Sequence, residues 1–305
     1  MVEAKADEDV FNGQTGATSG TEGADWVELP SADLLTVPLA DELLRWRAAN
    51  VIAVIGERNS GKTTLVTELY ERYLRGPFAG HLFAHSRTLV GFERKTFESR
   101  LNSERETPDT PRTSERDGLL FFHLGLVTDD ASTRRSDLLI SERAGETYRK
   151  ARDNPSLSNS LPELQKAARV AFLIDGERIA TGRLRAEAFA SVRGMIRAFS
   201  DGAAMAPTAE LQLVTTKADL LDGMPQALTA LEDFERAIGG AFRTPSRSVS
   251  VWRTAARDPR GRRPPGDGLA PLLASWLARS EVGRQAAPAW PELTSEFDLL
   301  AVRRP

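Results

Sequence analysis

Cysteine is absent from this chain of 305 residues, and histidine occurs only three times. The absence of cysteine excludes disulfide bonds, thiolate catalysis and thiolate metal sites, and three histidines are too few to favour a zinc site. A metal ion bound by this chain is therefore expected to have oxygen ligands, which indicates Mg²⁺ or a monovalent cation.

Long apolar runs and a strong net charge are also missing. The longest apolar runs have the length of single strands, far below the roughly 18 to 20 residues of a membrane span, and the acidic start MVEAKADEDV does not resemble a signal peptide. We therefore predict a cytoplasmic protein without a membrane span. The net charge of −3 gives no general attraction to nucleic acid, which we do not expect as a partner. The arginine-rich loop 257–263 is interpreted as a solvated surface turn.

Apolar periodicity divides the chain into three parts. Residues 1–28 lack it and are expected to form a flexible tail, residues 29–282 a single domain, and residues 283–305 an irregular C-terminal tail. Within the domain, strand-like and helix-like segments alternate, which predicts an α/β fold with helices on both faces of a mostly parallel sheet of about six strands. The strand-like segments are residues 51–55, 118–126, 138–140, 170–174, 211–215 and 249–252, of which the second and third favour an antiparallel pair.

The segment VIAVIGERNSGKTT, residues 51–64, has the pattern Gly-x-x-x-x-Gly-Lys-Thr between a strand and a helix. In this context, Gly56 and Gly61 allow the backbone to curl around phosphate groups, so that successive amides and a helix N-terminus bind one anion. Lys62 would contact the β- and γ-phosphates and Thr63 would bind Mg²⁺. The other expected nucleotide contacts in the loop are Arg58, Asn59, Ser60 and Thr64. The alternative is an ordinary glycine turn with an exposed lysine.

A carboxylate and a glycine follow the third strand-like segment. Glu142 would hold Mg²⁺ and the Gly145 amide would contact the γ-phosphate, as in the Asp-x-x-Gly motif of GTPases. GTPases have aspartate at the position of Glu142, so the longer side chain changes the reach to the ion. The alternative is a strand that ends in an exposed charged turn.

The segment Thr215-Thr-Lys-Ala-Asp219 follows the fifth strand-like segment and matches the Thr/Asn-Lys-x-Asp motif that recognises guanine. The carboxylate of Asp219 can accept two hydrogen bonds from the guanine edge, and adenine offers neither donor there. Lys217 would lay its alkyl stem against the base, and Thr216 would bond to loop backbone. The alternative is an exposed helix start.

A short segment of small residues follows the sixth strand-like segment. Thr254, Ala255 and Ala256 are similar to the Ser/Thr-Ala-x segment whose backbone contacts the guanine oxygen. Small residues suit a close approach to a base, although three residues fit a purely structural loop equally well.

The spacing of these motifs over roughly residues 50–280 resembles the TRAFAC class of P-loop GTPases, which implies a Ras-like three-layer sandwich with one antiparallel edge strand. The run GERNSGKTTLVTELYERYLRGPFAGHLFAHSRTLVGFERK, the segment TPDTPRT and the segment ISERAGE are similar to the bacterial double-GTPase family of predicted conflict or defence systems. This resemblance implies GTP or GDP with Mg²⁺ as the ligands, and a protein partner that is expected to be a second GTPase.

The same resemblance implies roles for four further residues. Thr110, with Thr107 and Thr113 as alternatives, would be the switch threonine that binds Mg²⁺ when the γ-phosphate is present. Glu146 stands where Ras-like enzymes have a glutamine, and it would orient or deprotonate the attacking water, or else only favour the helix start. An asparagine at the position of Asn59 also resembles the potassium-stimulated GTPases, which implies that Asn59 would help to hold K⁺ against the phosphates; the alternative is that it only shapes the loop. Arg58 would supply the positive charge itself, or its bulk would block the arginine finger of a partner.

Three functions are compatible with these motifs. The leading hypothesis is a Mg²⁺-dependent GTPase switch with slow or partner-stimulated hydrolysis. A nucleotide-binding scaffold with little hydrolysis is favoured by Glu142 and by the missing glutamine. A P-loop ATPase is the third, and Asp219 argues against it.

Overall fold

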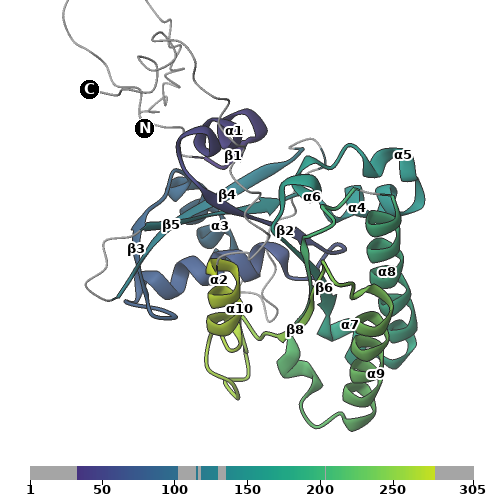
Figure 1. Cartoon of the computed structure of the whole chain (residues 1–305). Coiled ribbons are helices and arrows are strands. Elements are labelled where there is room, and N and C mark those ends of the chain that lie inside the picture. Colours follow the sequence, from purple (N-terminus) through teal and green to yellow (C-terminus); the bar gives the residue numbers. More distant parts are fainter. Residues whose placement is uncertain (1–32, 102–114, 116–117, 130–134, 203, 279–305) are drawn as a thin grey trace, which may run out of the picture. The chain divides into compact units, whose positions relative to one another are not determined.

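An eight-stranded sheet lies at the centre of the structure, a computed structural model that describes residues 33–101, 115, 118–129, 135–202 and 204–278 (Figure 1). The strands are β1 (Leu35–Thr36), β2 (Ala49–Ile55), β3 (His81–His85), β4 (Leu120–Thr128), β5 (Arg135–Glu142), β6 (Arg169–Asp175), β7 (Glu210–Thr216) and β8 (Val249–Arg253). Their order is β1-β4-β5-β2-β6-β7-β8, and β3 also pairs with β4.

Five neighbouring strands of this sheet, from β5 through β2, β6 and β7 to β8, are parallel. Strand β4 pairs antiparallel with β5, as predicted, but β1 and β3 pair with its other side, so β4 is not the edge. The α/β fold is thus confirmed with two more strands than the six expected. Neither additional strand has a long apolar run, because β1 has two residues and β3 has only residues 82–84 between two histidines.

Helices cover both faces of the sheet because neighbouring strand residues point to opposite sides. In β2, Val51, Ala53 and Ile55 pack into one apolar cluster, whereas Ile52 and Val54 pack into another. The first cluster lies under α1 (Val37–Trp46), α4 (Gly145–Asp153), α6 (Pro162–Lys166), α7 (Gly176–Ala180), α8 (Gly182–Asp201) and α9 (Pro225–Phe242). The second lies under α2 (Lys62–Leu74), α3 (Leu89–Leu101) and α10 (Leu269–Leu277). Helix α5 (Pro155–Ser158) and the short turn η3 (Ala218–Leu221) complete the order.

The carboxyl ends of the five parallel strands meet at one edge of the sheet. The segments with the predicted motifs follow β2, β5, β7 and β8, so the topology brings all four to this edge. Ligands of open α/β sheets bind at the carboxyl ends of the strands. The fold therefore assembles a single candidate site from segments that lie far apart in the sequence.

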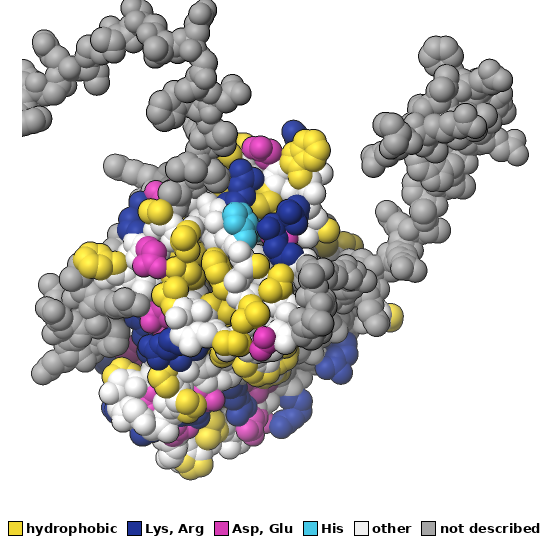
Figure 2. Space-filling model, turned by 90° about the vertical axis from the view of Figure 1, so that its left-hand side faces the viewer, with side chains coloured by type: hydrophobic (Ala, Val, Ile, Leu, Met, Phe, Trp, Pro, Cys, Tyr) yellow, Lys and Arg dark blue, Asp and Glu magenta, His cyan; other side chains and the backbone are white. Residues whose placement is uncertain are grey.

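Exposed apolar side chains gather on β3 and α3. Leu82, Leu89, Val90 and Phe97 are 38% to 60% exposed, and the space-filling view of this side of the molecule shows hydrophobic side chains between charged ones (Figure 2).

Among the described residues, none of the helices combines the length and the hydropathy that crossing a lipid bilayer requires.

Candidate nucleotide-binding site

The loop between β2 and α2 has the backbone that phosphate binding requires. Gly61 precedes α2 with a φ of 82°, a left-handed conformation that glycine adopts without strain. A Cβ atom on Gly56 would collide with the Ser60 hydroxyl and come within 3.0 Å of Leu173. Both motif glycines are therefore needed for the conformation of this loop.

Lys62, the first residue of α2, lies beneath the loop and is 8% exposed. Its ammonium group donates hydrogen bonds to the carbonyl oxygens of Gly56 at 2.9 Å and Glu57 at 2.8 Å. Burial lowers the pKa of Lys62, and the negative charges of Glu142, Glu146 and Glu57 only partly oppose this. The lysine is thus held inside the loop, where an anion would restore the favourable surroundings of its charge.

The two expected Mg²⁺ ligands of this loop and of β5 are in contact. Thr63 Oγ1 donates a hydrogen bond of 2.8 Å to Glu142 Oε1, and both side chains are buried. Hydroxyl and carboxylate oxygens are suitable ligands for Mg²⁺, which commonly takes one or two protein oxygens and completes its shell with phosphate and water. Among the described residues, no group of three or more histidine, aspartate or glutamate side chains is arranged to hold a metal ion. The pair of Thr63 and Glu142 would therefore bind Mg²⁺ together with phosphate and water.

Gly145 begins α4 and packs against the phosphate loop. A Cβ atom there would lie 2.6 Å from the amide nitrogen of Arg58 and 2.8 Å from the carbonyl oxygen of Gly56. The following residue, Glu146, lies close enough to Lys62 for its negative charge to oppose part of the lowering of the lysine pKa that burial causes. The segment after β5 is thus in direct contact with the phosphate loop.

Replacing Gly145 with alanine should separate α4 from the loop. We expect the overpacking to lower the free energy of unfolding by about 1 to 3 kcal/mol and to weaken nucleotide binding. Gly182→Ala is the matched control, because nothing lies within 4 Å of a Cβ atom at this other helix start. Chemical denaturation and nucleotide titration measure both effects, and equal behaviour of the two variants would contradict the close contact.

The segment after β7 is joined to the phosphate loop. Thr216 Oγ1 donates a hydrogen bond of 2.9 Å to the carbonyl oxygen of Ser60. Lys217 has a φ of 48°, a strained conformation for lysine of the kind that clusters at functional sites. Its ammonium group lies 3.1 Å from Asp175 and 2.7 Å from Glu177. Burial lowers the pKa of Lys217, but these two carboxylates outweigh burial and raise it overall.

Asp219 has the surroundings of a side chain that binds a ligand. It is 2% exposed, and its Oδ1 atom has no hydrogen-bond partner among the described residues. Burial and the nearby charge of Asp258 raise the pKa of Asp219 above its usual value. A buried carboxylate oxygen without a partner is unfavourable, so a donor from a ligand would stabilise this site.

The segment after β8 lies beside the segment after β7. The Thr254 amide donates to Thr215 O at 2.8 Å, and the Ala218 amide donates to Thr254 O at 3.0 Å. The Ala255 amide already donates to Asp267 O at 2.9 Å. The Ala255 amide is thus already bonded within the protein, and a contact of this segment with a base stays a prediction.

Comparison with known proteins agrees with this assembly of motifs. Residues 50–277, well over half of the chain, match the family described as Double-GTPase 2. The chain belongs to the Double-GTPase 2 family. Its membership confirms the resemblance predicted from the sequence and indicates a GTP-binding protein of the P-loop GTPase type. No curated protein matches.

Three solved structures illustrate the likeness to other proteins. The signal recognition particle receptor SRb-GTP/SRX complex of Chaetomium thermophilum is 15% identical over 76% of this chain and 97% of that chain, with a TM-score of 0.41. The Ski7 GTPase-like domain of S. cerevisiae, bound to GDP and inorganic phosphate, is 11% identical over 78% of this chain and 51% of that chain, with a TM-score of 0.41. An ADP-ribosylation-factor-like Sar1 GTPase of Encephalitozoon cuniculi with GDP is 12% identical over 78% of this chain and 82% of that chain, with a TM-score of 0.32. The chain spans about half of the Ski7 structure, and none of these weak likenesses transfers a function.

Two expected residues of this Double-GTPase 2 protein lie at the tip of its phosphate loop. Arg58 and Asn59 are exposed. Asn59 has a φ of 61°, a left-handed conformation that asparagine tolerates better than most residues. This conformation gives Asn59 a structural reason to be present, and its proposed contact with a cation stays a prediction. Thr110 and its alternatives Thr107 and Thr113 lie outside the described residues.

Glu57 is a residue of the site that the sequence did not reveal. Its carboxylate forms an ion pair with Arg178 of α7 and accepts a hydrogen bond from Ser191 of α8. Arg152 of α4 lies 3.9 Å from the same carboxylate. These partners are more than 90 positions away in the sequence, so no local pattern marks them. Glu57 fixes the phosphate loop to three helices of the domain.

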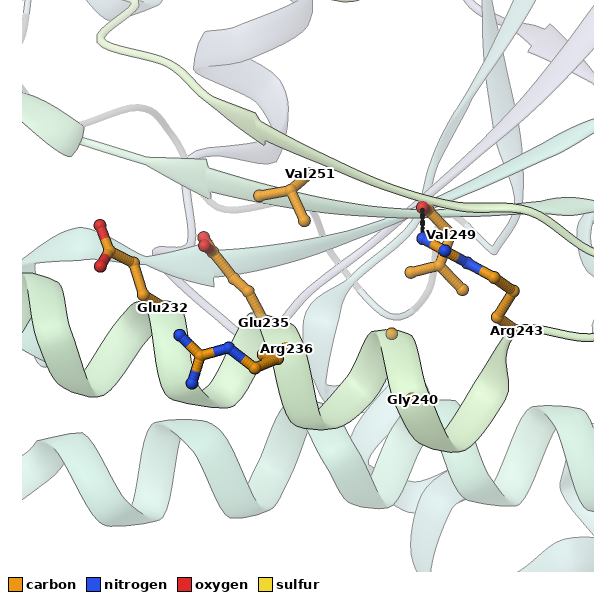
Figure 3. Close-up of a pocket in the computed structure, with 8 residues that line it drawn as sticks. Glu232, Glu235, Arg236, Gly240, Arg243, Val249 and Val251 are labelled. Atoms are coloured by element: carbon orange, nitrogen blue, oxygen red, sulfur yellow. Dashed lines mark hydrogen bonds between the residues drawn. The ribbon is translucent and has the colours of Figure 1, made fainter.

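A groove of about 770 Å³ lies elsewhere, between α9 and the edge strand β8 (Figure 3). Glu232, Glu235 and Arg236 line it from the helix, and Val249 and Val251 line it from the strand. Arg243 crosses one end and donates to Val249 O at 3.4 Å. None of the residues of the expected motifs lines this groove, so it is separate from the nucleotide site.

Proposed function

We propose that this chain is a guanine-nucleotide-binding P-loop GTPase that acts as a Mg²⁺-dependent molecular switch with slow or partner-stimulated hydrolysis. The proposal places it in the bacterial cytoplasm, within a multi-protein conflict or defence system, with residues 29–282 as the GTPase domain. A protein partner belongs to the proposal, and the description of the family favours a second GTPase.

The observation that carries the proposal is the hydrogen bond from Thr216 to the Ser60 carbonyl oxygen at 2.9 Å. This bond joins two segments: the one expected to recognise the base and the loop expected to bind the phosphates. Asp219, three residues after Thr216, is buried with an oxygen that has no partner in the described part of the chain. A guanine base can supply the donors that this oxygen needs, whereas adenine offers no donor on the corresponding edge.

Mg²⁺ fits the pair formed by Thr63 and Glu142. Their contacting oxygen atoms lie beside the first turn of α2, where Lys62 is also held. When bound, the ion would neutralise charge that develops on the transferred phosphoryl group. Three residues of the chain would surround the phosphoryl group. Lys62 is held by the loop, Gly145 lies at the start of α4, and Glu146 is the candidate to orient water.

A nucleotide-binding scaffold with little hydrolysis is the second candidate, and two observations favour it. Glu142 has one methylene more than the aspartate usual in GTPases and directly accepts a hydrogen bond from Thr63. Glu146 occupies the place of the glutamine that orients water in Ras-like enzymes. Both differences affect hydrolysis more than binding.

Competition between unlabelled GTP and ATP for fluorescent GDP tests the leading proposal. We expect GTP to displace the probe at concentrations at least about tenfold lower than ATP, because unpaired groups at the base edge cost about 1 to 3 kcal/mol. Equal competition by ATP would overturn guanine recognition. Phosphate release with and without Mg²⁺ then distinguishes the switch from the scaffold.

Hydrolysis in matched KCl and NaCl tests the proposed contact of Asn59 with K⁺. If Asn59 holds the ion, K⁺ should raise the wild-type rate, since a monovalent cation stabilises the developing charge. Asn59→Gly should remove this stimulation, and it keeps the left-handed backbone that Asn59→Ala would strain. Equal wild-type rates in both salts would end the cation hypothesis, and a large loss confined to Arg58→Ala would assign the charge to Arg58.

A further inference from the structure

The arginine-rich loop 257–263 between β8 and α10 has an ordered internal structure. Its centre is Asp258, whose carboxylate accepts hydrogen bonds from the amides of Arg260 at 2.9 Å, Arg262 at 2.8 Å and Arg263 at 3.0 Å. Three such bonds to one carboxylate define the path of the backbone. The sequence-based interpretation as a solvated turn is therefore incomplete, because the loop has a fixed conformation.

Two arginines attach this loop to both halves of the nucleotide site. Arg257 pairs with Glu68 at 3.2 Å and with Glu71 at 3.0 Å, both on α2, the helix that begins with Lys62. Arg263 donates to Asp222 at 2.9 Å, one residue after η3. The loop thus spans from the phosphate-binding helix to the turn that contains the expected base-reading residue.

Arg262 contacts that base-reading residue directly. Its Nη2 atom donates a hydrogen bond of 2.9 Å to the backbone oxygen of Asp219 and lies 3.6 Å from the Oδ2 atom of the same residue. The other carboxylate oxygen, Oδ1, has no hydrogen-bond partner within the described residues. The guanidinium therefore holds one side of Asp219 and leaves the other side for a ligand.

We propose that Arg262 is a positioning residue for guanine selectivity, which orients the carboxylate of Asp219 and keeps it ionised for the base. This inference rests on the proposed function. A protonated or turned carboxylate could not accept two hydrogen bonds from the guanine edge, so selectivity depends on whatever fixes its charge and direction. The Nε atom of the same guanidinium lies 3.6 Å from Oδ2 of Asp258, so this planar group reaches two carboxylates at once. The single ammonium group of lysine is less suited to this task.

The charges around Asp219 make such support necessary. Burial and the carboxylate of Asp258 raise the pKa of Asp219, whereas Arg262 and Arg263 act in the opposite direction. Removal of Arg262 should raise this pKa further. Guanine binding needs an ionised Asp219. As the solution is acidified, a variant without Arg262 should therefore lose guanine binding at a higher pH than the wild type does.

Affinity measurements with fluorescent GDP and ADP between pH 5 and 8 test the proposal on the full chain. We expect Arg262→Ala to weaken GDP binding about tenfold, as for the loss of one hydrogen bond to a charged group, while ADP binding stays unchanged. The acidic limb of the GDP affinity profile should move to higher pH. Arg262→Lys, which keeps the charge but not the planar group that also reaches Asp258, should fall between wild type and Arg262→Ala.

Arg260→Ala is the matched control, because this exposed arginine belongs to the same loop, and it should bind GDP like the wild type. Thermal unfolding of each variant reports the state of the fold. Unchanged or tighter GDP binding by Arg262→Ala, or an equal loss for GDP and ADP, would overturn the role of Arg262. A wild-type protein that does not prefer GDP to ADP would instead overturn the proposed function itself.

Discussion

Lys62→Ala is expected to weaken GTP binding about 10- to 100-fold. The ammonium group is buried beneath the loop and bonded to the carbonyl oxygens of Gly56 and Glu57, so in the complex it would face the phosphates without competition from bulk water. A charge-assisted hydrogen bond of this kind contributes about 1.5 to 3 kcal/mol, which corresponds to that range of affinity. Titration of the variant with fluorescent GTP measures the loss.

The fold itself should tolerate this substitution. Burial disfavours the charged form of Lys62 and lowers its pKa, so its removal relieves a desolvation cost while it deletes two hydrogen bonds. We expect the free energy of unfolding to change by no more than about 1 kcal/mol. Lys166→Ala is the control, since this lysine pairs with Asp41 away from the site. Unaltered GTP affinity in the Lys62 variant would exclude the loop as the phosphate site.

Asp219→Asn should exchange the preference of the protein from guanine to xanthine nucleotides. Asparagine offers an amide donor where aspartate has an acceptor, and the carbonyl oxygen that xanthine has in place of the exocyclic amine of guanine can accept this hydrogen bond. We expect GDP affinity to fall at least tenfold and XDP affinity to rise, because the wrong pairing leaves buried polar groups without partners. Parallel titrations with GDP, XDP and ADP measure this exchange.

Asp222→Asn gives the matched control for base recognition. Asp222 lies three residues after Asp219 and pairs with Arg263, which also pairs with Asp267 at 3.0 Å. Arg262 contacts Asp219 directly, so the substitution of Asp222 should leave the preference for guanine unchanged. A similar shift in both variants would mean that the local turn, and not the carboxylate of Asp219, determines the preference.

The parts of the site that depend on local sequence could be predicted. The phosphate loop and the segment from Thr215 to Asp219 are short motifs, each directly after a buried strand, so the pattern of a few residues fixes both their structure and their place in the fold. The spacing of the motifs indicated a P-loop GTPase, and the resemblance to the double-GTPase family rested on three longer segments, residues 56–95, TPDTPRT and ISERAGE. The family match over residues 50–277 confirms it. The parallel strands were found because burial on both faces gives continuous apolar runs.

The parts that depend on distant partners could not be predicted. The sequence does not indicate that Arg262 lies against Asp219 or that Arg178 pairs with Glu57, because these pairs are 43 and 121 positions apart. Strand β3 escaped prediction for a different reason: its apolar run is only residues 82–84, and its side chains are partly exposed. Its existence depends on backbone pairing with β4, which leaves little trace in the residue types.

The hydrogen bond from Thr216 to Ser60 also affects the thermodynamics of ligand binding. It joins two protein groups across 156 positions of the chain, so the order of the phosphate loop comes from the fold of the protein. Fixing the backbone of one residue costs roughly 1 to 2 kcal/mol of conformational entropy. Because this entropy is lost when the chain folds, a nucleotide meets a preorganised loop, and more of its interaction energy remains as affinity.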